Sequence, residues 1–448
     1  MGNNPVGADG THLSAADEPA RHYRCVGIGV GPANLSLASL LHGKDDVPNL
    51  FLERKEQFTW HDGQQIPGAS LQVSLFKDLV TLADPTNSFS FLSYLHDRGR
   101  IYHFINAQFG AVPRREFRDY LRWASERNEN IAFGEEVRSV GFTDRFVVRT
   151  TKRTVTADHV VIGVGNGPWV PEQARSLLGP TQFHVSEYVE RARDLGGARV
   201  AVVGGGQSGA EAFLDLLARP DGERPGRITW ISRRRNYLPI DDSPFSNDYF
   251  TPGYSDHFFG LDRSEREAFT AEQVLLSDGI SLDTVREIYQ RIYLRRFVHA
   301  DEDQVVLWPD RAVTGVARAG DGAGWELTVR PNGAARPAER TTVDVVVWAT
   351  GFRPAGLDFL APIADRLERE GAEFKLDHNF AVVWDGPPEH HVFVQNGARV
   401  QRGLADPNLS LIAWRSQRIA DRIRGVKSDD QFESFIRWSS PPVTEDLR

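Results

Sequence analysis

The chain has 448 residues, 40% of them hydrophobic and 25% charged, which allows two or three domains with a large core. Its formal net charge of −9 argues against a nucleic-acid or anionic-membrane partner. No apolar run approaches the roughly 20 residues of a membrane span, and the only cysteine, Cys25, excludes a disulfide within the chain and fits a reducing cytoplasm.

The first nucleotide-binding signal lies near the N-terminus. Residues 1–20 are polar, lack an apolar signal-peptide core and are predicted to form a disordered tail. A buried strand over residues 23–27 then runs into the turn Gly27-Ile-Gly29-Val-Gly31-Pro32-Ala33-Asn34 and a helix over about 32–41. Glycines let the backbone approach a pyrophosphate, and the helix N-terminus offers free N–H groups and a positive dipole to the anion.

An acidic residue follows at the spacing that such a site requires. The next strand, over residues 49–52, ends in Glu53, which lies 22 residues after Gly31, where a dinucleotide fold places the acid that binds a ribose. Residues 57–110 are aromatic and irregular but too apolar for a solvent loop, so they are predicted to form a pocket wall. An amphipathic helix over 115–126 and strands over 142–150 and 154–164 are predicted next.

A second glycine-rich turn begins about 175 residues after the first. A strand from residue 198 runs into Gly204-Gly205-Gly206-Gln207-Ser208-Gly209, followed by a helix over 210–217 and a strand over 228–231. The basic run Arg233-Arg234-Arg235 then stands where a 2′-phosphate would lie, and arginine suits phosphate geometry. A solvated basic edge is the alternative interpretation of this run. Two dinucleotides on one enzyme imply electron transfer between them.

The remaining elements complete the predicted plan. Residues 236–300 contain an irregular piece, 243–252, and a helical stretch, 281–296. An apolar strand over 342–348 runs into Thr350-Gly351, and the chain ends with a strand over 391–395 and a helix over about 412–423. The chain is therefore predicted to be an α/β protein with two Rossmann-like dinucleotide-binding domains, the second inserted in the first, plus a small substrate-binding region.

Several motifs outside the glycine turns carry a specific resemblance. They are Phe58-Thr-Trp60-His61, Leu71-Gln72-Val-Ser-Leu-Phe-Lys77-Asp78-Leu, Asp84-Pro85-Thr86, Asn247-Asp-Tyr-Phe-Thr-Pro252, Trp348-Ala-Thr350-Gly351-Phe352 and Asp406-Pro-Asn408-Leu409-Ser410-Leu. Together with the two turns, the chain resembles the class B flavin N-hydroxylating monooxygenases of siderophore biosynthesis over nearly all of residues 22–425. One departure is Asn34, which stands where a third glycine is common; that position serves helix packing more than phosphate approach.

The resemblance assigns cofactors and domains. It implies FAD at Gly27–Asn34 and Glu53, NADPH at Gly204–Gly209 with Arg233 and Arg234, and a C4a-hydroperoxyflavin, formed with O₂, that hydroxylates a primary amine. The FAD-binding domain is predicted to have two parts, 21–190 and 341–448. The NADPH-binding domain, 191–340, lies between them and contains a substrate-binding insertion, 236–300.

The resemblance also implies roles for single residues. Trp60, His61 and Gln72 would line the isoalloxazine, although Trp60 and His61 could instead pack in the core. Thr350 and Gly351 would close over the nucleotide, and Asn408, Leu409 and Ser410 belong to the C-terminal site motif. Lys77 would pair with the α-carboxylate of an amino-acid substrate, with Gln72 beside it, and Asn247 would hydrogen-bond the substrate and the nicotinamide nucleotide.

The alternatives for Lys77 bear on the substrate. A buried lysine needs an anionic partner, and an internal salt bridge to Asp78 or Asp84 would satisfy it without any substrate. A diamine has no carboxylate, so Lys77 favours L-lysine over cadaverine or putrescine. A second asparagine found in ornithine enzymes is absent, and the region reads Leu276-Ser277-Asp278-Gly279-Ile280-Ser281, which makes L-ornithine the least favoured amine.

Other protein classes fit less well. A flavin disulfide reductase needs a redox cysteine pair, and a Baeyer–Villiger monooxygenase would show Phe-x-Gly-x-x-x-His where this chain has Gln182-Phe183-His184. A non-catalytic NADPH sensor would not need Lys77 and Asn247 together. The pair His390-His391 is predicted to start a strand, and no metal site is expected. A homo-oligomer, either a dimer or a tetramer, is expected.

Overall fold

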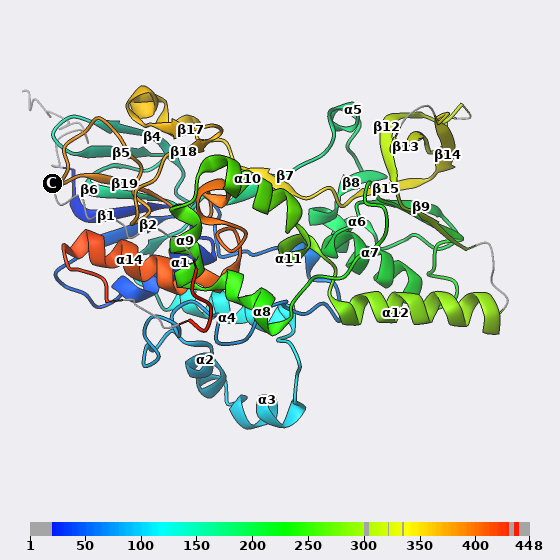
Figure 1. The fold of residues 1–448 in the computed structure, drawn as a ribbon, viewed down its shortest axis with the longest axis horizontal. Coiled ribbons are helices and arrows are strands. Elements are labelled where there is room, and N and C mark those ends of the chain that lie inside the picture. Colours follow the sequence, from blue (N-terminus) through cyan, green and yellow to red (C-terminus); the bar gives the residue numbers. More distant parts are fainter. Residues whose placement is uncertain (1–19, 300–303, 321, 334–335, 430–433, 439–448) are drawn as a thin grey trace, which may run out of the picture.

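The computed structural model describes residues 20–299, 304–320, 322–333, 336–429 and 434–438. The predicted tail over residues 1–20 therefore lies almost wholly outside the described residues. Figure 1 shows two sheets, one in each half of the molecule, with a group of short helices between them. In the part of the chain that is described, no helix is long and apolar enough to cross a membrane.

The first sheet contains a parallel core of the kind that carries a nucleotide. Its strand order is β3-β2-β1-β6-β5-β4, and β19 also pairs with β6. The bounds are β1 His22–Ile28, β2 Asn49–Leu52, β3 Ile131–Ala132, β4 Val137–Phe142, β5 Phe146–Thr150, β6 Thr154–Ile162 and β19 His391–Val394. The strands β1, β2, β3, β6 and β19 run parallel, whereas β4, β5 and β6 form an antiparallel meander.

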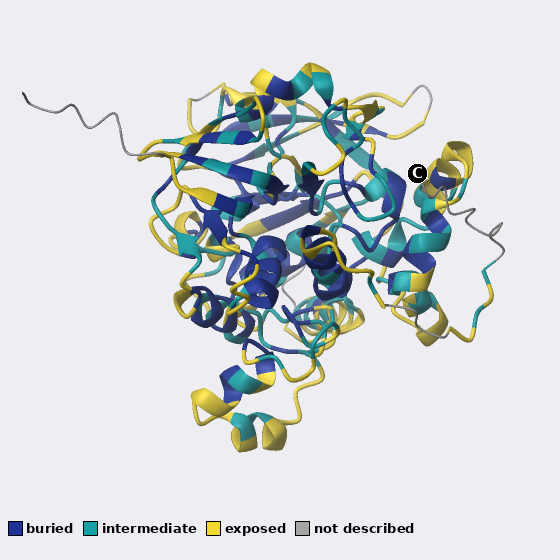
Figure 2. Ribbon diagram, turned by 90° about the vertical axis from the view of Figure 1, so that its left-hand side faces the viewer, coloured by how far each residue is buried: buried dark blue, intermediate teal, exposed yellow. Residues whose placement is uncertain are grey.

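Helices cover this sheet and complete the first core. The helices α1 (Pro32–Leu41) and α14 (Ile412–Arg424) pack against each other, and α4 (Arg114–Glu126) packs on α1. The strand β2 is buried along its whole length, and three of its four residues, Leu50, Phe51 and Leu52, are apolar, as is usual for a parallel strand inside a sheet. In Figure 2 the buried residues concentrate in the strands and helices at the middle of the molecule.

The second sheet is entirely parallel, with strand order β11-β10-β9-β15-β8. Its strands are β8 Gln182–His184, β9 Arg199–Val203, β10 Arg227–Ile231, β11 Val305–Trp308 and β15 Val345–Trp348. The helices α7 (Gln207–Ala218) and α12 (Leu282–Tyr293) pack together beside it, and α12 continues into a π turn, Leu294–Val298. A three-stranded antiparallel sheet, β12 (Arg311–Arg318), β13 (Trp325–Pro331) and β14 (Glu339–Val343), shares a core with it.

Two details of the predicted plan are wrong. The apolar run 342–348 is not one strand, since it divides at Asp344 into β14 and β15, which belong to different sheets. The Asp344 carboxylate accepts the backbone N–H of Arg199 at 2.7 Å and thereby fixes the start of β15 beside β9. Both β8 and β15 lie in the second sheet. The boundaries predicted at 190/191 and 340/341 would instead assign these two strands to the domain of the first sheet.

Helices also occur where the sequence predicted irregular structure. Within 57–110 they are α2 (Phe91–Asp97) and α3 (Ile101–Ala107), with a 3₁₀ turn at Asp62–Gln64. Within 236–300, where 243–252 was predicted to be irregular and no helix was predicted before 281, they are α8 (Pro244–Asn247), α9 (Pro252–Phe259), α10 (Arg263–Glu272) and α11 (Leu275–Asp278), with a 3₁₀ turn at Asp248–Phe250. Local capping explains them: Ser90 caps α2, Thr251 caps α9, and Asp262 forms a capping box with Glu265.

Two adjacent crossings connect the halves. The strands β7 (Asn166–Pro168) and β16 (Phe352–Pro354) pair antiparallel where the chain leaves the first sheet and returns to it. The remaining short elements are α5 Glu172–Arg175, α6 Tyr188–Arg191, α13 Arg399–Arg402, β17 Arg369–Glu370, β18 Glu373–Phe374 and 3₁₀ turns at Val185–Glu187, Asp358–Arg366 and Leu409–Leu411.

Candidate active site

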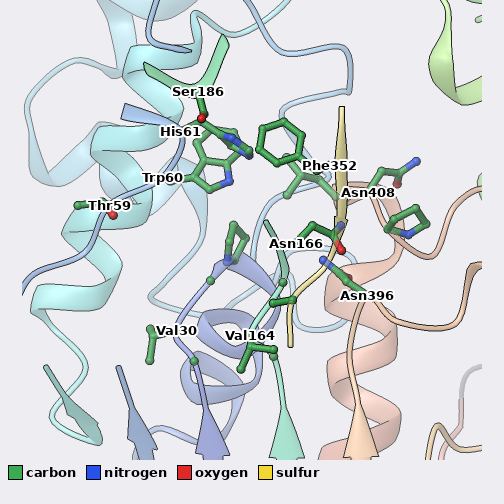
Figure 3. Close-up of a pocket in the computed structure, with 18 of the residues that line it drawn as sticks. Val30, Thr59, Trp60, His61, Val164, Asn166, Ser186, Phe352, Asn396 and Asn408 are labelled. Carbon is green, nitrogen blue, oxygen red and sulfur yellow. The ribbon is translucent and has the colours of Figure 1, made fainter. Parts of the chain in front are cut away.

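A cavity of about 1090 Å³ lies where the two halves meet. It is lined by fourteen of the residues predicted for the site: Gly29, Gly31, Pro32, Glu53, Trp60, His61, Gln72, Lys77, Gln207, Ser208, Asn247, Asn408, Leu409 and Ser410. Another group of predicted residues does not line it: Gly27, Asn34, Gly204, Gly206, Gly209, Arg233, Arg234, Thr350 and Gly351. The structure therefore brings segments from both halves of the chain to one cavity (Figure 3).

The first glycine turn leaves room for a ligand at its tip. Gly29 has a φ of +81°, and a Cβ there would lie 2.8 Å from the carbonyl oxygen of Gly163, so only glycine fits. A Cβ on Gly31 would meet no described atom closer than that same oxygen, at 3.9 Å. The helix α1 begins after Gly31 without a side-chain cap, and its first N–H groups remain available to an anion.

Glu53 and Asn34 support this turn in different ways. The Glu53 carboxylate accepts the backbone N–H of Val30 at 2.8 Å and that of Lys55 at 3.0 Å, which holds it at the cavity wall. The Asn34 side chain is fully buried behind the turn and donates to the carbonyl oxygen of Gly29 at 2.8 Å. Asn34 thus acts on the turn and not directly in the cavity. An open helix N-terminus, a glycine tip and a fixed acid suit the pyrophosphate and ribose of FAD.

The second turn is hydrogen-bonded to residues from the half of the molecule that contains the first sheet. Ser208 accepts a hydrogen bond from Gln64 Nε2 at 3.1 Å. Arg114, at the start of α4, donates to both Glu211 carboxylate oxygens at 2.7 and 2.6 Å, and Glu211 also accepts from Gln207 Nε2 at 2.9 Å. Sequence analysis missed Arg114 and Glu211 because a polar pair across 97 positions leaves no local pattern.

The basic run lines a separate cavity of about 620 Å³ beside the second turn. Its members differ in what they contact. Arg234 Nη1 donates to the carbonyl oxygens of Asp278 at 2.6 Å and Gly205 at 3.2 Å, so it fastens the glycine turn to the segment that precedes α12. Arg233 and Arg235 are exposed in this second cavity.

Aromatic side chains form one wall of the main cavity. The Trp60 ring packs 5.9 Å from Phe117 in the first core and also lines the cavity, so it is not confined to core packing. The His61 ring lies 5.0 Å from Trp60 and 5.8 Å from Phe352, as Figure 3 shows. Burial, aided by the charge of Arg114, lowers the pKa of His61 to about 4, so this wall is uncharged at neutral pH.

Lys77 lies on the same cavity, and no acidic side chain of the described residues pairs with it. Its Nζ donates to Ser410 Oγ at 3.1 Å and lies 5.8 Å from the centre of the Phe250 ring. Neither alternative partner pairs with it: the Asp78 carboxylate accepts the backbone N–H groups of Val80, Thr81 and Phe91, and Asp84 bonds to Thr86 and Asn87. Burial lowers the pKa of Lys77.

The other predicted residues lie either on the cavity wall or in the connection between the two halves. Gln72 is exposed on the cavity wall, and Asn247 donates to the carbonyl oxygen of Asp242 at 2.8 Å. Thr350 and Gly351 lie in the crossing between the halves, where Thr350 donates to the carbonyl oxygen of Trp169 at 2.5 Å and the Gly351 carbonyl accepts the backbone N–H of Trp169 at 2.9 Å. They join the two connecting strands.

Several polar cavity residues had no sequence signal. Asn166 and Asn396 follow β6 and β19, which are neighbouring parallel strands, and Figure 3 shows their side chains near Asn408. Polar residues just after parallel strands could have been noted, because carboxyl ends of such strands bind ligands. In the described ranges no group of three or more His, Cys, Asp or Glu side chains could hold a metal ion.

Two dinucleotide-type turns that open onto one cavity define an oxidoreductase with two nucleotide cofactors. Residues 21–354 match the sequence profile of the L-lysine 6-monooxygenase/L-ornithine 5-monooxygenase family. The chain is also 37% identical over 426 residues to the L-lysine N6-monooxygenase of Escherichia coli, which covers 93% of this chain and 98% of that one. The chain belongs to this family.

Solved structures agree with this membership. The FAD-bound cadaverine monooxygenase of desferrioxamine biosynthesis from Erwinia amylovora has a TM-score of 0.86 at 27% identity, with 94% of this chain and 99% of that one covered. The ornithine N-hydroxylase of Kutzneria sp. 744, with reduced FAD, NADP⁺ and L-ornithine, has a TM-score of 0.81 at 30% identity, with 91% and 99% covered. The predicted fold class, enzyme class and cofactor pair are confirmed.

Proposed function

We propose that this protein uses FAD, NADPH and O₂ to hydroxylate the terminal amine of L-lysine for the biosynthesis of a hydroxamate siderophore or a related natural product. The observation that carries the substrate is Lys77, whose ammonium lines the same cavity as both nucleotide turns and, among the described residues, contacts a hydroxyl and an aromatic ring but no carboxylate. A half-buried cation in this position is stabilised by an anion, and the α-carboxylate of an amino acid would supply one.

FAD would lie against the first turn. Its pyrophosphate would meet the open N-terminus of α1 after Gly31, its ribose would meet Glu53, and its ring would lie beside Trp60 and His61. When bound, the flavin accepts hydride from NADPH and then supplies the oxygen atom from O₂.

NADPH would lie against the second turn. Gln207 and Ser208, at the start of α7, face the cavity from the opposite side. The 2′-phosphate of NADPH would be bound by Arg233 and Arg235, which are exposed. Arg234 instead holds the turn in place by donating to two backbone carbonyl oxygens.

The substrate amine must be neutral to attack. With a lysine pKa of about 10.4, only about one amine in a thousand is neutral near pH 7.4. The wall of Trp60, His61 and Phe352 is uncharged at that pH and offers an ammonium group no counter-ion, so it would disfavour the ammonium form of the bound amine. Lys77 at the other end, with Gln72 and Asn247, would fix the carboxylate and hold the side chain extended toward this wall.

A diamine is the alternative substrate. The similarity to a cadaverine monooxygenase supports cadaverine or putrescine, and neither needs Lys77. L-ornithine is less favoured because the second family asparagine is absent from the segment Leu276–Ser281.

The test is hydroxylamine formation by the purified, FAD-loaded protein with NADPH and each of L-lysine, L-ornithine, cadaverine and putrescine. We expect the highest kcat/KM with L-lysine. A preference for either diamine would contradict the proposal and favour the alternative. The predicted dimer or tetramer stays a prediction, which light scattering on the same sample would check.

A further inference from the structure

The main cavity contains both paired and unpaired charges. Two of its cations have acidic partners: Arg114 binds Glu211, and Arg138 binds Glu136. Lys77, Arg54 and Lys55 line the cavity with no acidic partner in the described part of the chain. Arg54 and Lys55 directly follow Glu53 after β2, so they belong to the side formed by the first glycine turn.

The carboxylates divide in the same way. Glu53 accepts two backbone N–H groups, Glu135 binds Arg153, Glu136 binds Arg138, and Asp241 accepts from Ser243 and Ser246. Asp242 and Asp358 are the two cavity carboxylates for which the described residues provide no partner. Asp358 starts a 3₁₀ turn that packs against β4, on the side of the first sheet.

Asp242 instead lies on the substrate side. The Asp241 carboxylate accepts the backbone N–H of Ser243 at 3.2 Å and the Ser246 hydroxyl at 2.8 Å, which fixes the turn before α8. Asn247 Nδ2 closes the same turn on the carbonyl oxygen of Asp242 at 2.8 Å. The segment then reaches Phe250, whose buried ring lies 5.8 Å from the Lys77 ammonium. The carboxylate of Asp242 is left exposed to the cavity.

We propose that Lys77 and Asp242 together bind the zwitterionic head of an α-amino acid, Lys77 its carboxylate and Asp242 its α-ammonium. This inference rests on the proposed function and specifies the substrate class of the same site. The substrate side of the cavity offers one unpaired cation and one unpaired anion, which is the complement of that head group. Asp242 must act at the head, because a carboxylate beside the reacting amine would stabilise its unreactive ammonium form.

Two simpler amines allow the contributions of Lys77 and Asp242 to be measured separately. Cadaverine is lysine without its carboxylate, and 6-aminohexanoate is lysine without its α-amine. Cadaverine therefore presents a cation to Asp242 and nothing to Lys77, whereas 6-aminohexanoate presents an anion to Lys77 and nothing to Asp242. Only an α-amino acid uses both side chains.

The experiment measures hydroxylamine formation by wild type, Lys77→Met and Asp242→Asn with L-lysine, cadaverine and 6-aminohexanoate. We expect Lys77→Met to lower kcat/KM about tenfold or more for L-lysine and 6-aminohexanoate and not for cadaverine. Asp242→Asn should lower it to a similar extent for L-lysine and cadaverine and not for 6-aminohexanoate. Asp248→Asn is the matched control, since Asp248 lies in the same segment but does not line the cavity, and it should behave as wild type.

The pattern across substrates decides the outcome. If Asp242→Asn lowers activity equally with all three amines, or with none, Asp242 does not bind the α-ammonium and the inference is wrong. FAD content and the thermal midpoint of each variant show whether an equal loss reflects misfolding, and Asp242→Glu, which keeps the charge, should retain more L-lysine activity than Asp242→Asn. If wild type forms no hydroxylamine from any amine, the proposed function itself fails.

Discussion

The ion pair between Arg114 and Glu211 is predicted to hold the two nucleotide sites in register. Arg114 begins α4 of the first half and Glu211 lies in the second turn of α7, so the pair crosses between the halves. The two side chains are 15% and 6% exposed, and both guanidinium nitrogens bind the carboxylate at 2.7 and 2.6 Å. Glu211 also holds Gln207, which lines the main cavity.

Removing both partners should destabilise the protein by less than the sum of the two single removals. Arg114→Met or Glu211→Met leaves a charge buried without its counter-ion, which typically costs about 3–5 kcal/mol of stability. The double variant leaves neither charge, so its loss should be smaller than the sum by about 2 kcal/mol or more. Because Glu211 anchors Gln207, the single variant Glu211→Met should also raise the KM for NADPH.

The assay is a double-mutant cycle on the FAD-loaded protein, with urea unfolding followed by tryptophan fluorescence. The exposed pair Arg191–Glu187, whose side chains are 36% and 39% exposed, provides the control. Its coupling should be only about 0.3–0.5 kcal/mol, as is usual for an exposed helical pair. Additive effects of Arg114→Met and Glu211→Met would refute the reasoning, because they would show that the two side chains do not stabilise each other.

Three further predictions follow from single positions. Gly31→Ala adds a methyl whose nearest described atom is a backbone oxygen 3.9 Å away, so the variant should fold while its FAD affinity, measured by flavin titration, falls about tenfold or more. Arg233→Ala should raise the KM for NADPH and leave that for NADH nearly unchanged, whereas Arg234→Ala should raise both because it loosens the turn; equal losses at Arg233 would argue against a 2′-phosphate contact. Burial lowers the pKa of His159 to about 3, so the unfolded chain takes up this proton below its ordinary pKa of about 6.5 and the folded protein does not. Stability should therefore be complete above pH 6.5 and fall as the pH drops toward 3, by about 2 kcal/mol at pH 5 from this group, and His159→Phe should flatten that loss in urea unfolding measured from pH 7 to 5.

The first nucleotide-binding turn could be predicted from the sequence because its structure depends on neighbouring residues. The first glycine turn, the helix after it and Glu53 follow from residue types and one spacing, and the structure places Glu53 on the turn as expected. The helices α9 and α10 were missed although Thr251 and Asp262 cap them locally. Both capping signals are present in the sequence, so local residue types alone were enough to indicate where these helices begin.

Contacts between distant segments could not be predicted in the same way. The apolar run 342–348 has no break in its pattern strong enough to show that Asp344 divides it between two sheets. Arg234 and Arg233 are adjacent and chemically identical, yet only the fold shows that Arg234 bonds to two carbonyl oxygens. Lys77 was singled out correctly as a lysine without an obvious partner, but Ser410, its hydrogen-bond acceptor, lies 333 positions away.

On the proposed function, the cavity must treat two amines in opposite ways. Burial lowers the pKa of Lys77, and the same desolvation acts on the terminal amine of the substrate. Lys77 is compensated by the Ser410 hydroxyl, the Phe250 ring and an arriving carboxylate, so it keeps its proton. The substrate amine meets the uncharged wall of Trp60 and His61, where nothing compensates the loss of water, so it gives its proton up. Charge at one end and a neutral nucleophile at the other would thus arise in one cavity, because the Lys77 end offers a hydroxyl, an aromatic ring and a carboxylate to a cation, whereas the uncharged rings of Trp60 and His61 offer a cation no counter-ion.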